Sequence, residues 1–324
     1  MDVMFYEVFQ EEAMALRKYV GHKYHAEFTA DTTQLGGQDK PPAPVISIRT
    51  QSLIPDSWAK HLKGIHARSV GYEHVLQYEE RNGVRLASGY LPNYCSRSVA
   101  EHALLLMMEL LKKSVKQHAQ FASFNRDNLT GSELLHKNLL VVGVGNIGSE
   151  VVALGRGVAM QVKGVDIVRN DKELDYVTLD QGVEWADVIV CALPNARETI
   201  GMLGYDVLKN AKPGLVLVNV SRGEVSPIRD MKQLLDEGVL AGLGLDVFEE
   251  ENILGDYLRT GRGSLSDSGK IILELAHREN TVFTPHNGFN THESVDRKAR
   301  QSCEAVSEFL NKGRFPHPVP SSPW

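Results

Sequence analysis

The chain has few cysteines and no long apolar run. Its 324 residues include three widely spaced cysteines, Cys95, Cys191 and Cys303, with no CxxC pair. This count supports neither a disulfide framework nor a zinc site, so we expect no bound metal and a reducing, cytoplasmic setting. No stretch approaches the roughly 20 apolar residues of a membrane helix, and the acidic N-terminus lacks the pattern of a signal peptide. We therefore expect no membrane partner.

The chain also has fewer basic residues than acidic ones. The chain carries 35 Lys and Arg against 41 Asp and Glu, a net charge of −6. Nucleic acids attract basic surfaces, so this balance argues against nucleic acid as the main partner. Apolar residues make up 42% of the chain, as in ordinary globular proteins, and the length suggests roughly two domains.

Short apolar runs alternate with helical stretches, which predicts parallel sheets covered by helices. In the first part we expect strands at 3–8, 44–49, 65–70 and 84–87, with helices at 10–20 and 73–82. A long apolar helix over 97–117 follows. Six further runs, at 139–142, 162–165, 188–192, 215–220, 243–247 and 282–284, predict a doubly wound sheet. A last helix over 293–310 comes after that sheet has ended, so we expect it to return to the first domain.

The run LLVV leads into the glycine-rich hexamer GVGNIG, residues 143–148. Gly143 suits the tight turn, Gly145 lets a pyrophosphate approach, and Gly148 lets helix and strand pack closely. Asn146 and Ile147 begin the helix whose N–H groups face the phosphates. The hexamer alone is a weak signal that also fits a simple glycine bend. The strand before it and the helix after it favour dinucleotide binding.

Asp166 ends the next predicted strand, in the segment GVD. A carboxylate there accepts hydrogen bonds from ribose hydroxyls and repels a 2′-phosphate, which favours NAD over NADP. Arg169 lies nearby, so NADP stays possible as the cofactor. Asp166 could also be an ordinary acidic residue of a solvated loop.

Three later segments place reactive side chains where strands end. Arg222 follows the strand in VNVSRG, a cluster of acids follows the strand in LDVFEEE, and His286 follows the strand in VFTPHNG. Ligands of open α/β sheets bind at this edge, and an arginine there offers a planar fork to a carboxylate. Each segment alone has an ordinary structural explanation. Together, beside a dinucleotide turn, they indicate an active site.

These motifs, GVGNIG, VDI, NVSRGE, LDVFEEE and TPHNGF, come in an order that resembles the D-isomer-specific 2-hydroxyacid dehydrogenase family over nearly the whole chain. The resemblance implies two Rossmann/flavodoxin-like, doubly wound α/β domains. An NAD-binding domain over 98–290 would be inserted into a substrate-binding domain made of 1–97 and 291–324. It also implies NAD as cofactor, a small 2-oxo or 2-hydroxy acid as substrate, and a homodimer formed through the NAD domains.

The resemblance also assigns roles to single residues. Arg222 would bind the carboxylate and carbonyl of the substrate, and His286 would be the general acid and base. Glu251 would pair with His286, with Glu249 and Glu250 as alternatives in the same acidic cluster. Pro194, Ser221 and Asp246 would bind the cofactor, with Asp246 on the carboxamide side of the nicotinamide.

Substrate binding would involve the segment Ser69, Val70 and Gly71, whose N–H groups resemble those that hold the substrate carboxylate in this family. Tyr94 and Phe289 resemble the aromatic residues that line the pocket in the D-lactate branch, although they also fit plain packing. The chain departs from that branch at Arg49, Asn290 and Lys298. Arg49 would either bind a second anionic group on the substrate or form an ordinary ion pair.

The resemblance therefore favours NAD-dependent interconversion of pyruvate and D-lactate. Phenylpyruvate, hydroxypyruvate, glyoxylate and 2-oxoglutarate remain alternative substrates. A different class also stays open, because the family includes NAD-sensing corepressors that keep the same three polar residues, and a fold does not settle a function.

Overall fold

The computed structural model describes residues 1–320, which fold into two compact units. The first unit combines Met1–Cys95 with the segment that begins at Asn290, and the second is Ser96–Phe289. The expected domain boundaries, 97/98 and 290/291, lie within two residues of these divisions. Residues 321–324 of the expected substrate-binding domain lie outside the described residues.

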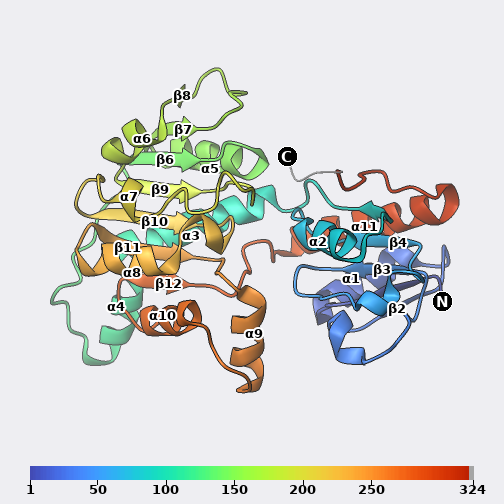
Figure 1. The fold of residues 1–324 in the computed structure, drawn as a ribbon. Helices are drawn as coiled ribbons and strands as arrows, with labels where there is room; N and C mark the ends of the chain where they lie inside the picture. Colours follow the sequence, from blue (N-terminus) through green and yellow to red (C-terminus); the bar gives the residue numbers. More distant parts are fainter. Residues whose placement is uncertain (321–324) are drawn as a thin grey trace. The chain divides into compact units, whose positions relative to one another are not determined.

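A five-stranded parallel sheet in the order β2-β1-β3-β4-β5 forms the centre of the first unit (Figure 1). Its strands are β1 (Val3–Phe5), β2 (Ala26–Phe28), β3 (Val45–Ile48), β4 (Gly64–Ala67) and β5 (Ala87–Gly89). Its helices are α1 (Gln10–Val20), α2 (Glu73–Asn82) and α11 (His292–Lys312), with short 3-10 turns η1 (Thr33–Gly36) and η2 (Asp56–Trp58). Residues of α1 and α11 share one apolar cluster with the sheet, and residues of α2 share another, so both faces are covered. Every residue of β3 and β4 is therefore buried, as is usual for a parallel sheet.

The helix at the C-terminal end packs in the first unit, against α1 and β4. Gly64 of β4 lets this happen, because a Cβ there would lie 2.7 Å from the ring of Phe309 on α11. The first unit is thus built from both ends of the described chain, which is the arrangement that the family resemblance implies.

The second unit holds a seven-stranded parallel sheet in the order β12-β11-β10-β9-β6-β7-β8 (Figure 1). Its strands are β6 (Asn138–Val142), β7 (Gln161–Val165), β8 (Asp175–Tyr176), β9 (Val188–Cys191), β10 (Leu215–Asn219), β11 (Leu240–Leu245) and β12 (Thr281–Phe283). Its helices are α3 (Ser96–Lys112), α4 (Ser114–Gln120), α5 (Asn146–Gly157), α6 (Leu179–Trp185), α7 (Tyr205–Leu208), α8 (Ile228–Asp236), α9 (Glu251–Thr260) and α10 (Asp267–Leu275); η3 (Phe121–Ser123) and η4 (Gly223–Val225) are 3-10 turns. The strand order reverses at β6, as in a doubly wound sheet. The predicted fold class is confirmed.

Several expected elements differ from the observed ones. The helix expected over 97–117 is interrupted at Lys113, whose backbone is left-handed with φ 54°, so that α3 and α4 are separate helices. The strand expected at 84–87 is observed as β5 at Ala87–Gly89, because pairing with β4 begins only at Gly64 and Ala87. The short strands β2 and β8 were not expected from the apolar pattern.

Candidate active site

Three neighbouring strands of the second unit bring the predicted polar side chains to one edge. Strands β10, β11 and β12 lie side by side and run parallel, so their carboxyl ends meet at the same edge of the sheet (Figure 1). Arg222 follows β10, Asp246 follows β11 directly, and His286 follows β12. Ligands of open α/β sheets bind at this edge.

His286 and Glu251 are in direct contact. The Nδ1 atom of His286 lies 2.8 Å from Oε1 and 2.9 Å from Oε2 of Glu251, which is the first residue of α9. Both side chains are partly buried, with 29% and 25% of their surface exposed. A carboxylate at Nδ1 orients the ring and leaves Nε2 as the nitrogen that can exchange a proton with a ligand. Of the three candidate glutamates, Glu251 is thus the one placed beside the histidine.

The other two candidates have different surroundings. Glu249 accepts a hydrogen bond from the backbone N–H of Ile228 at 2.7 Å, at the start of α8. Burial, together with the nearby Glu224, raises the pKa of Glu249, while the bond from Ile228 opposes the shift. Glu250 has a left-handed backbone with φ 50° and precedes α9. The structure therefore gives Glu249 a capping contact rather than a histidine partner.

Asp246 holds the loop that carries His286. Its carboxylate accepts hydrogen bonds from the Thr284 hydroxyl at 2.6 Å and from the backbone N–H groups of Asn287 and Gly288 at 2.8 and 2.9 Å. The side chain is nearly fully buried; burial alone would raise its pKa, but His102 and these hydrogen bonds lower it. His286 itself has φ 50°, a strained conformation for a non-glycine residue. The contacts of Asp246 on both sides of His286 help to hold that conformation.

The backbone before Arg222 is also held by buried contacts. The Asn219 side chain donates to the Arg222 carbonyl and to the Ser226 hydroxyl, both at 2.8 Å, and accepts from the N–H and hydroxyl of Ser221. A Cβ at Gly223 would lie 2.1 Å from the carbonyl carbon of Phe248, so only glycine allows the segment after β10 to approach the segment after β11. The segment that carries Arg222 therefore lies against the segment that leads to Glu251.

The glycine turn has the shape that a dinucleotide phosphate needs. Gly143 has φ 91° and lies against the backbone of Ala192, where a Cβ would come within 2.8 Å. Gly145 is exposed, and nothing lies within 4 Å of where its Cβ would stand. Helix α5 begins at Asn146, followed by Ile147, and Gly145 offers no side chain to cap it. Open space next to the first turn of this helix, at the positive end of the helix dipole, fits a bound pyrophosphate.

Three of the remaining cofactor candidates follow the strands β7, β9 and β10. Asp166 follows β7 and accepts hydrogen bonds from the N–H groups of Val144, at 2.6 Å, and Val168, at 2.8 Å, so it also braces the turn. Ser221 is buried, with its hydroxyl 3.2 Å from the Cys191 sulfur. Pro194 follows β9 and accepts a hydrogen bond from Thr199 at 2.8 Å.

Replacing Gly148 with alanine is expected to weaken NADH binding by about 10- to 100-fold. A Cβ there would lie 1.9 Å from the Gly143 carbonyl oxygen, and overpacking of this kind costs about 1–3 kcal/mol. The measurement is the Kd for NADH by fluorescence titration. Gly157→Ala at the other end of α5 is the matched control, because nothing lies within 4 Å of its Cβ position. Equal affinities for NADH in the two variants would contradict this account of the turn.

The expected substrate-binding residues are divided between the units. Ser69, Val70 and Gly71 follow β4 in the first unit, where the Ser69 hydroxyl donates to the Gly71 carbonyl at 2.6 Å. Tyr94 is also in the first unit and is buried, and its carbonyl accepts hydrogen bonds from Ser294 and Arg297 of α11. Phe289 is the last residue of the second unit and is buried.

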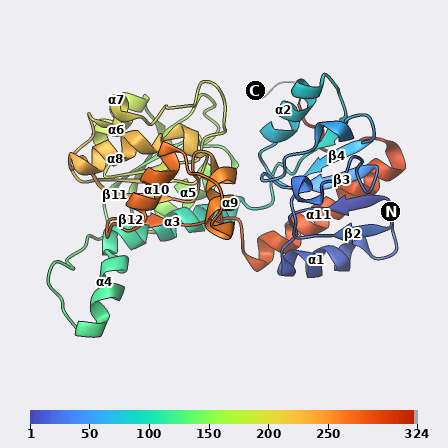
Figure 2. The same cartoon turned by 60° about the horizontal axis from the view of Figure 1, so that its bottom comes forward.

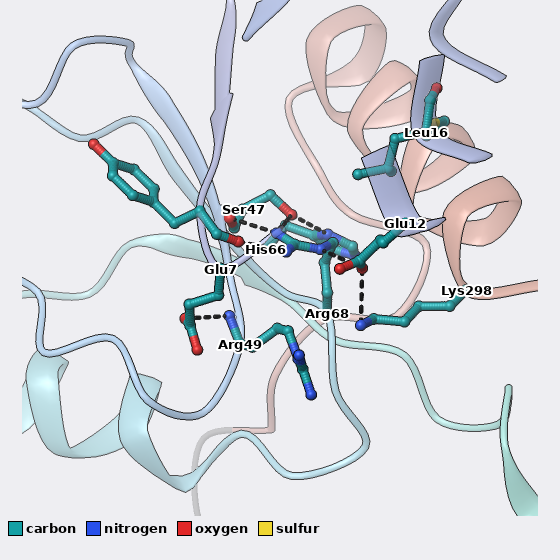
Figure 3. A network of polar contacts seen from close by, with 10 residues as sticks. Glu7, Glu12, Leu16, Ser47, Arg49, His66, Arg68 and Lys298 are labelled. Carbon is teal, nitrogen blue, oxygen red and sulfur yellow. Dashed lines mark hydrogen bonds and ion pairs between the residues drawn. The ribbon is translucent and has the colours of Figure 1, made fainter. Parts of the chain in front are cut away.

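Arg49 follows β3 in the first unit (Figure 3). It is half-buried, and its backbone N–H donates to the Glu7 carboxylate at 2.8 Å. In the same network Glu12 of α1 is completely buried, and its Oε1 accepts from the Lys298 ammonium at 2.8 Å and from Arg68 Nε at 3.2 Å.

Two polar residues of this region were not expected from the sequence. Asn219 lies inside the segment VNVSRG and is the last residue of β10. Its position, as a polar residue at the end of an apolar strand, is a signal that could have identified it. His102, on α3, contacts the Thr284 hydroxyl at 2.8 Å and Asp246 at 3.4 Å. Nothing in the sequence around His102 distinguishes it from an ordinary residue of an apolar helix.

Residues 1–320 contain neither a cluster of metal-binding side chains nor a membrane-spanning helix. Within that range no group of three or more His, Cys, Asp or Glu side chains is arranged to hold a metal ion. No helix in the described part of the chain is both long enough and apolar enough to span a bilayer.

Comparison with known proteins agrees with this geometry. Residues 104–288 match the family model of the NAD binding domain of D-isomer specific 2-hydroxyacid dehydrogenases. The chain is 27% identical over 260 residues to a D-lactate dehydrogenase of Streptococcus agalactiae, covering 78% of this chain and 77% of that one. It is 28% identical over 260 residues to a D-lactate dehydrogenase of Lactiplantibacillus plantarum, with the same coverage.

A solved structure is similar over the whole length. The D-lactate dehydrogenase of Aquifex aeolicus, in complex with NAD and lactic acid, has a TM-score of 0.85 at 29% identity and is covered completely. The matched family model spans more than half of the chain and includes the glycine turn, Arg222, Glu251 and His286. The chain therefore belongs to the D-isomer-specific 2-hydroxyacid dehydrogenase family and is an NAD-dependent oxidoreductase.

Proposed function

We propose that the protein reduces pyruvate to D-lactate with NADH, and catalyses the reverse reaction. The observation that carries this proposal is the pairing of His286 with Glu251 at the sheet edge that also presents Arg222. The first unit, expected as 1–97 and 291–324, would bind the substrate. The second, expected as 98–290, would bind NAD. The names of the relatives support pyruvate and D-lactate as the substrate pair.

The reaction needs a hydride and a proton at the substrate carbonyl. Bound NADH supplies the hydride when the glycine turn and Asp166 hold the cofactor. His286 donates the proton from Nε2 as negative charge develops on the carbonyl oxygen. Glu251 holds the ring through Nδ1 and leaves Nε2 available for the proton transfer. In the oxidation direction the same nitrogen accepts the proton of the hydroxyl group.

Arg222 orients the substrate and stabilises the developing charge. One guanidinium nitrogen donates to the Ser221 carbonyl at 2.8 Å, which fixes the side chain near the end of β10. Its planar fork suits the substrate carboxylate, and its charge stabilises the transition state. We also propose substrate contacts in the first unit at the N–H groups of Ser69, Val70 and Gly71 and at Tyr94, and in the second unit at Phe289.

NADH oxidation by the purified protein tests this function. We expect pyruvate to be reduced with NADH in preference to NADPH, because Asp166 repels a 2′-phosphate. The product is expected to be D-lactate, identified by chiral chromatography. L-Lactate as the product, or a clear preference for NADPH, would contradict the proposal.

We also propose a homodimer formed through the second unit. Helix α4 and the loop after it project from the rest of this unit in both views (Figures 1 and 2). Exposed apolar side chains lie on α3, α4 and η3 and directly after η3: Leu105, Met108, Val115, Phe121 and Phe124. Phe121 has 76% of its surface open to solvent. An apolar surface of this kind is typical of a protein interface.

Phe121→Asp is expected to raise the dissociation constant of the dimer by at least about tenfold, because a charge replaces an exposed aromatic contact. Sedimentation velocity over a range of concentrations measures the change. Leu35→Asp in the first unit is the matched control, since Leu35 is 71% exposed but lies outside the proposed interface. A monomeric wild type would contradict the dimer, as would equal behaviour of the two variants.

A cytoplasmic location completes the proposal. The three cysteines are buried, and none forms a disulfide in the described part of the chain. This agrees with a reducing compartment. Cell fractionation with a cytoplasmic marker enzyme tests the location.

A further inference from the structure

His102 is a polar residue on the face of α3 that packs against the sheet of the second unit. Helix α3 contacts β10, β11 and β12 (Figure 2). Leu106, one turn after His102, meets the sheet at Gly244 of β11, where a Cβ would lie 3.2 Å from that of Leu106. Residues four apart share one face of a helix, so His102 points to the same side. Its side chain is 14% exposed, and a polar ring buried in this way costs free energy unless it is hydrogen-bonded.

The ring of His102 reaches the loop that carries His286. Its Nε2 lies 2.8 Å from the Thr284 hydroxyl oxygen and 3.4 Å from Oδ1 of Asp246. The loop also passes close to the ring at Gly288, where a Cβ would lie 3.2 Å from Cδ2 of His102. His102 therefore lies against the chain on both sides of His286.

The hydrogen bonds define which of these groups donates. Burial alone would raise the pKa of Asp246, but its hydrogen bonds lower it, so the carboxylate is ionised near neutral pH and only accepts hydrogen bonds. The single hydroxyl proton of Thr284 goes to Oδ1 of Asp246, at 2.6 Å. The Thr284 oxygen then accepts from His102, so we assign a proton to Nε2 of His102.

The carboxylate of Asp246 in turn holds the backbone next to His286. It accepts hydrogen bonds from the N–H groups of Asn287 and Gly288, the two residues after His286. His286 has φ 50°, and such a conformation persists only where the surroundings hold it. The ring of His286 must also stay 2.8 Å from Glu251. A loop without these contacts would relax, and the His286 ring would change its direction.

We propose that His102 is a positioning residue that holds His286 in the conformation that proton transfer needs. Its Nε2 proton fixes the Thr284 hydroxyl, which in turn fixes the Asp246 carboxylate. This inference rests on the proposed function, because it takes His286 as the group that transfers the proton. A misplacement of about 1 Å can lower a rate by about 100-fold. Because His102 acts through other residues on the proton transfer, its effect should appear in kcat rather than in the KM for pyruvate.

Two substitutions of His102 separate its proton from its ring. His102→Phe keeps a ring beside Gly288 but removes the donor, and His102→Gln keeps a donor of similar reach. Loss of a hydrogen bond in a network with a charged group should lower kcat for pyruvate reduction by about 10- to 100-fold in His102→Phe. His102→Gln should recover most of that loss. His277→Phe, at an exposed histidine of the same unit, is the matched control and should keep the wild-type rate.

Thr284→Val distinguishes positioning from a general loss of packing. Valine has nearly the shape of threonine but lacks the hydroxyl that joins His102 to Asp246. If His102 acts through that hydroxyl, the variant with both His102→Phe and Thr284→Val should have about the kcat of the slower single variant. Separate structural damage would instead multiply the two losses. Multiplied losses, or equal losses in His102→Phe and His102→Gln, would overturn the inference.

The position of His286 can also be followed without turnover. Heteronuclear NMR of the histidine side chains gives imidazole resonances, and those of His286 are identified by their absence in His286→Ala. They should shift in His102→Phe and in Thr284→Val, and much less in His102→Gln. Unchanged resonances in His102→Phe would contradict the inference. If the wild type reduces no 2-oxo acid at all, the proposed function fails instead, and these resonances alone decide whether His102 holds His286.

Discussion

Replacing His286 with alanine is expected to lower kcat for pyruvate reduction by about 10²- to 10⁴-fold, the usual contribution of a general acid. The substrate oxygen would lose its proton donor, and no other histidine among the described residues contacts Glu251. NADH binding should stay close to that of the wild type, because the glycine turn is at a different strand end, after β6. Steady-state rates and a fluorescence titration with NADH measure the two effects separately.

Two further variants show whether the loss of activity is specific to His286 and its partner. His277→Ala is the matched control, because His277 is an exposed histidine of the same unit, and it should keep the wild-type rate. Glu251→Gln keeps the size of the side chain but not its charge, so it should lower kcat less than His286→Ala does. Near-wild-type turnover in His286→Ala would remove the histidine from the mechanism.

Replacing Glu12 with glutamine is expected to lower the free energy of unfolding by about 3–5 kcal/mol, the typical effect of removing one partner from a buried ion pair. The change would leave the charges of Lys298 and Arg68 buried without the carboxylate between them. Urea unfolding measures the loss, followed through the fluorescence of Trp58, which is buried in the same unit. Glu11→Gln, its exposed neighbour on α1, should stay within about 0.5 kcal/mol of the wild type.

The same carboxylate predicts a sensitivity to acid. Burial alone would raise the pKa of Glu12, but the charges of Lys298, Arg68 and Arg49 outweigh it and lower the pKa from 4.5 to about 2. The unfolded chain then binds a proton first, so the contribution of Glu12 is complete above pH 4.5 and disappears as the pH falls toward 2. Glu12→Gln should flatten the decline of stability in that window. An unchanged decline, or a stability for Glu12→Gln equal to that of Glu11→Gln, would contradict the importance of the pair.

Helices with clear local signals were predictable from the sequence. The expected ranges 10–20 and 73–82 coincide with α1 and α2, because an apolar face repeats at helical spacing and a glycine follows each helix. The expected helix over 97–117 was wrong at its C-terminal end, since the pattern contains no glycine or proline to announce the left-handed Lys113. The short strands β2 and β8 were missed because two or three residues give no periodic signal.

The active-site residues were predicted from their positions after apolar strands more than from their residue types. Arg222, Asp246 and His286 each follow an apolar strand, and parallel strands bring such residues together. Glu251 was separated from Glu249 and Glu250 only by the family pattern, and the structure places Glu251 beside His286. The pair of Glu12 with Lys298 was not predictable, because it joins α1 and α11, which are about 280 residues apart in the sequence. Only the packing of α1 against α11 brings these two residues together.

The central claim is that the His286–Glu251 pair and Arg222 reduce a 2-oxo acid with a hydride from NADH. Its most direct test is the rate of NADH oxidation by the purified wild-type protein with pyruvate, with the chirality of the product determined in the same reaction. The account predicts turnover that yields D-lactate. Tight binding of NADH without oxidation by pyruvate or any other 2-oxo acid would contradict it, and would favour an NAD-sensing role instead.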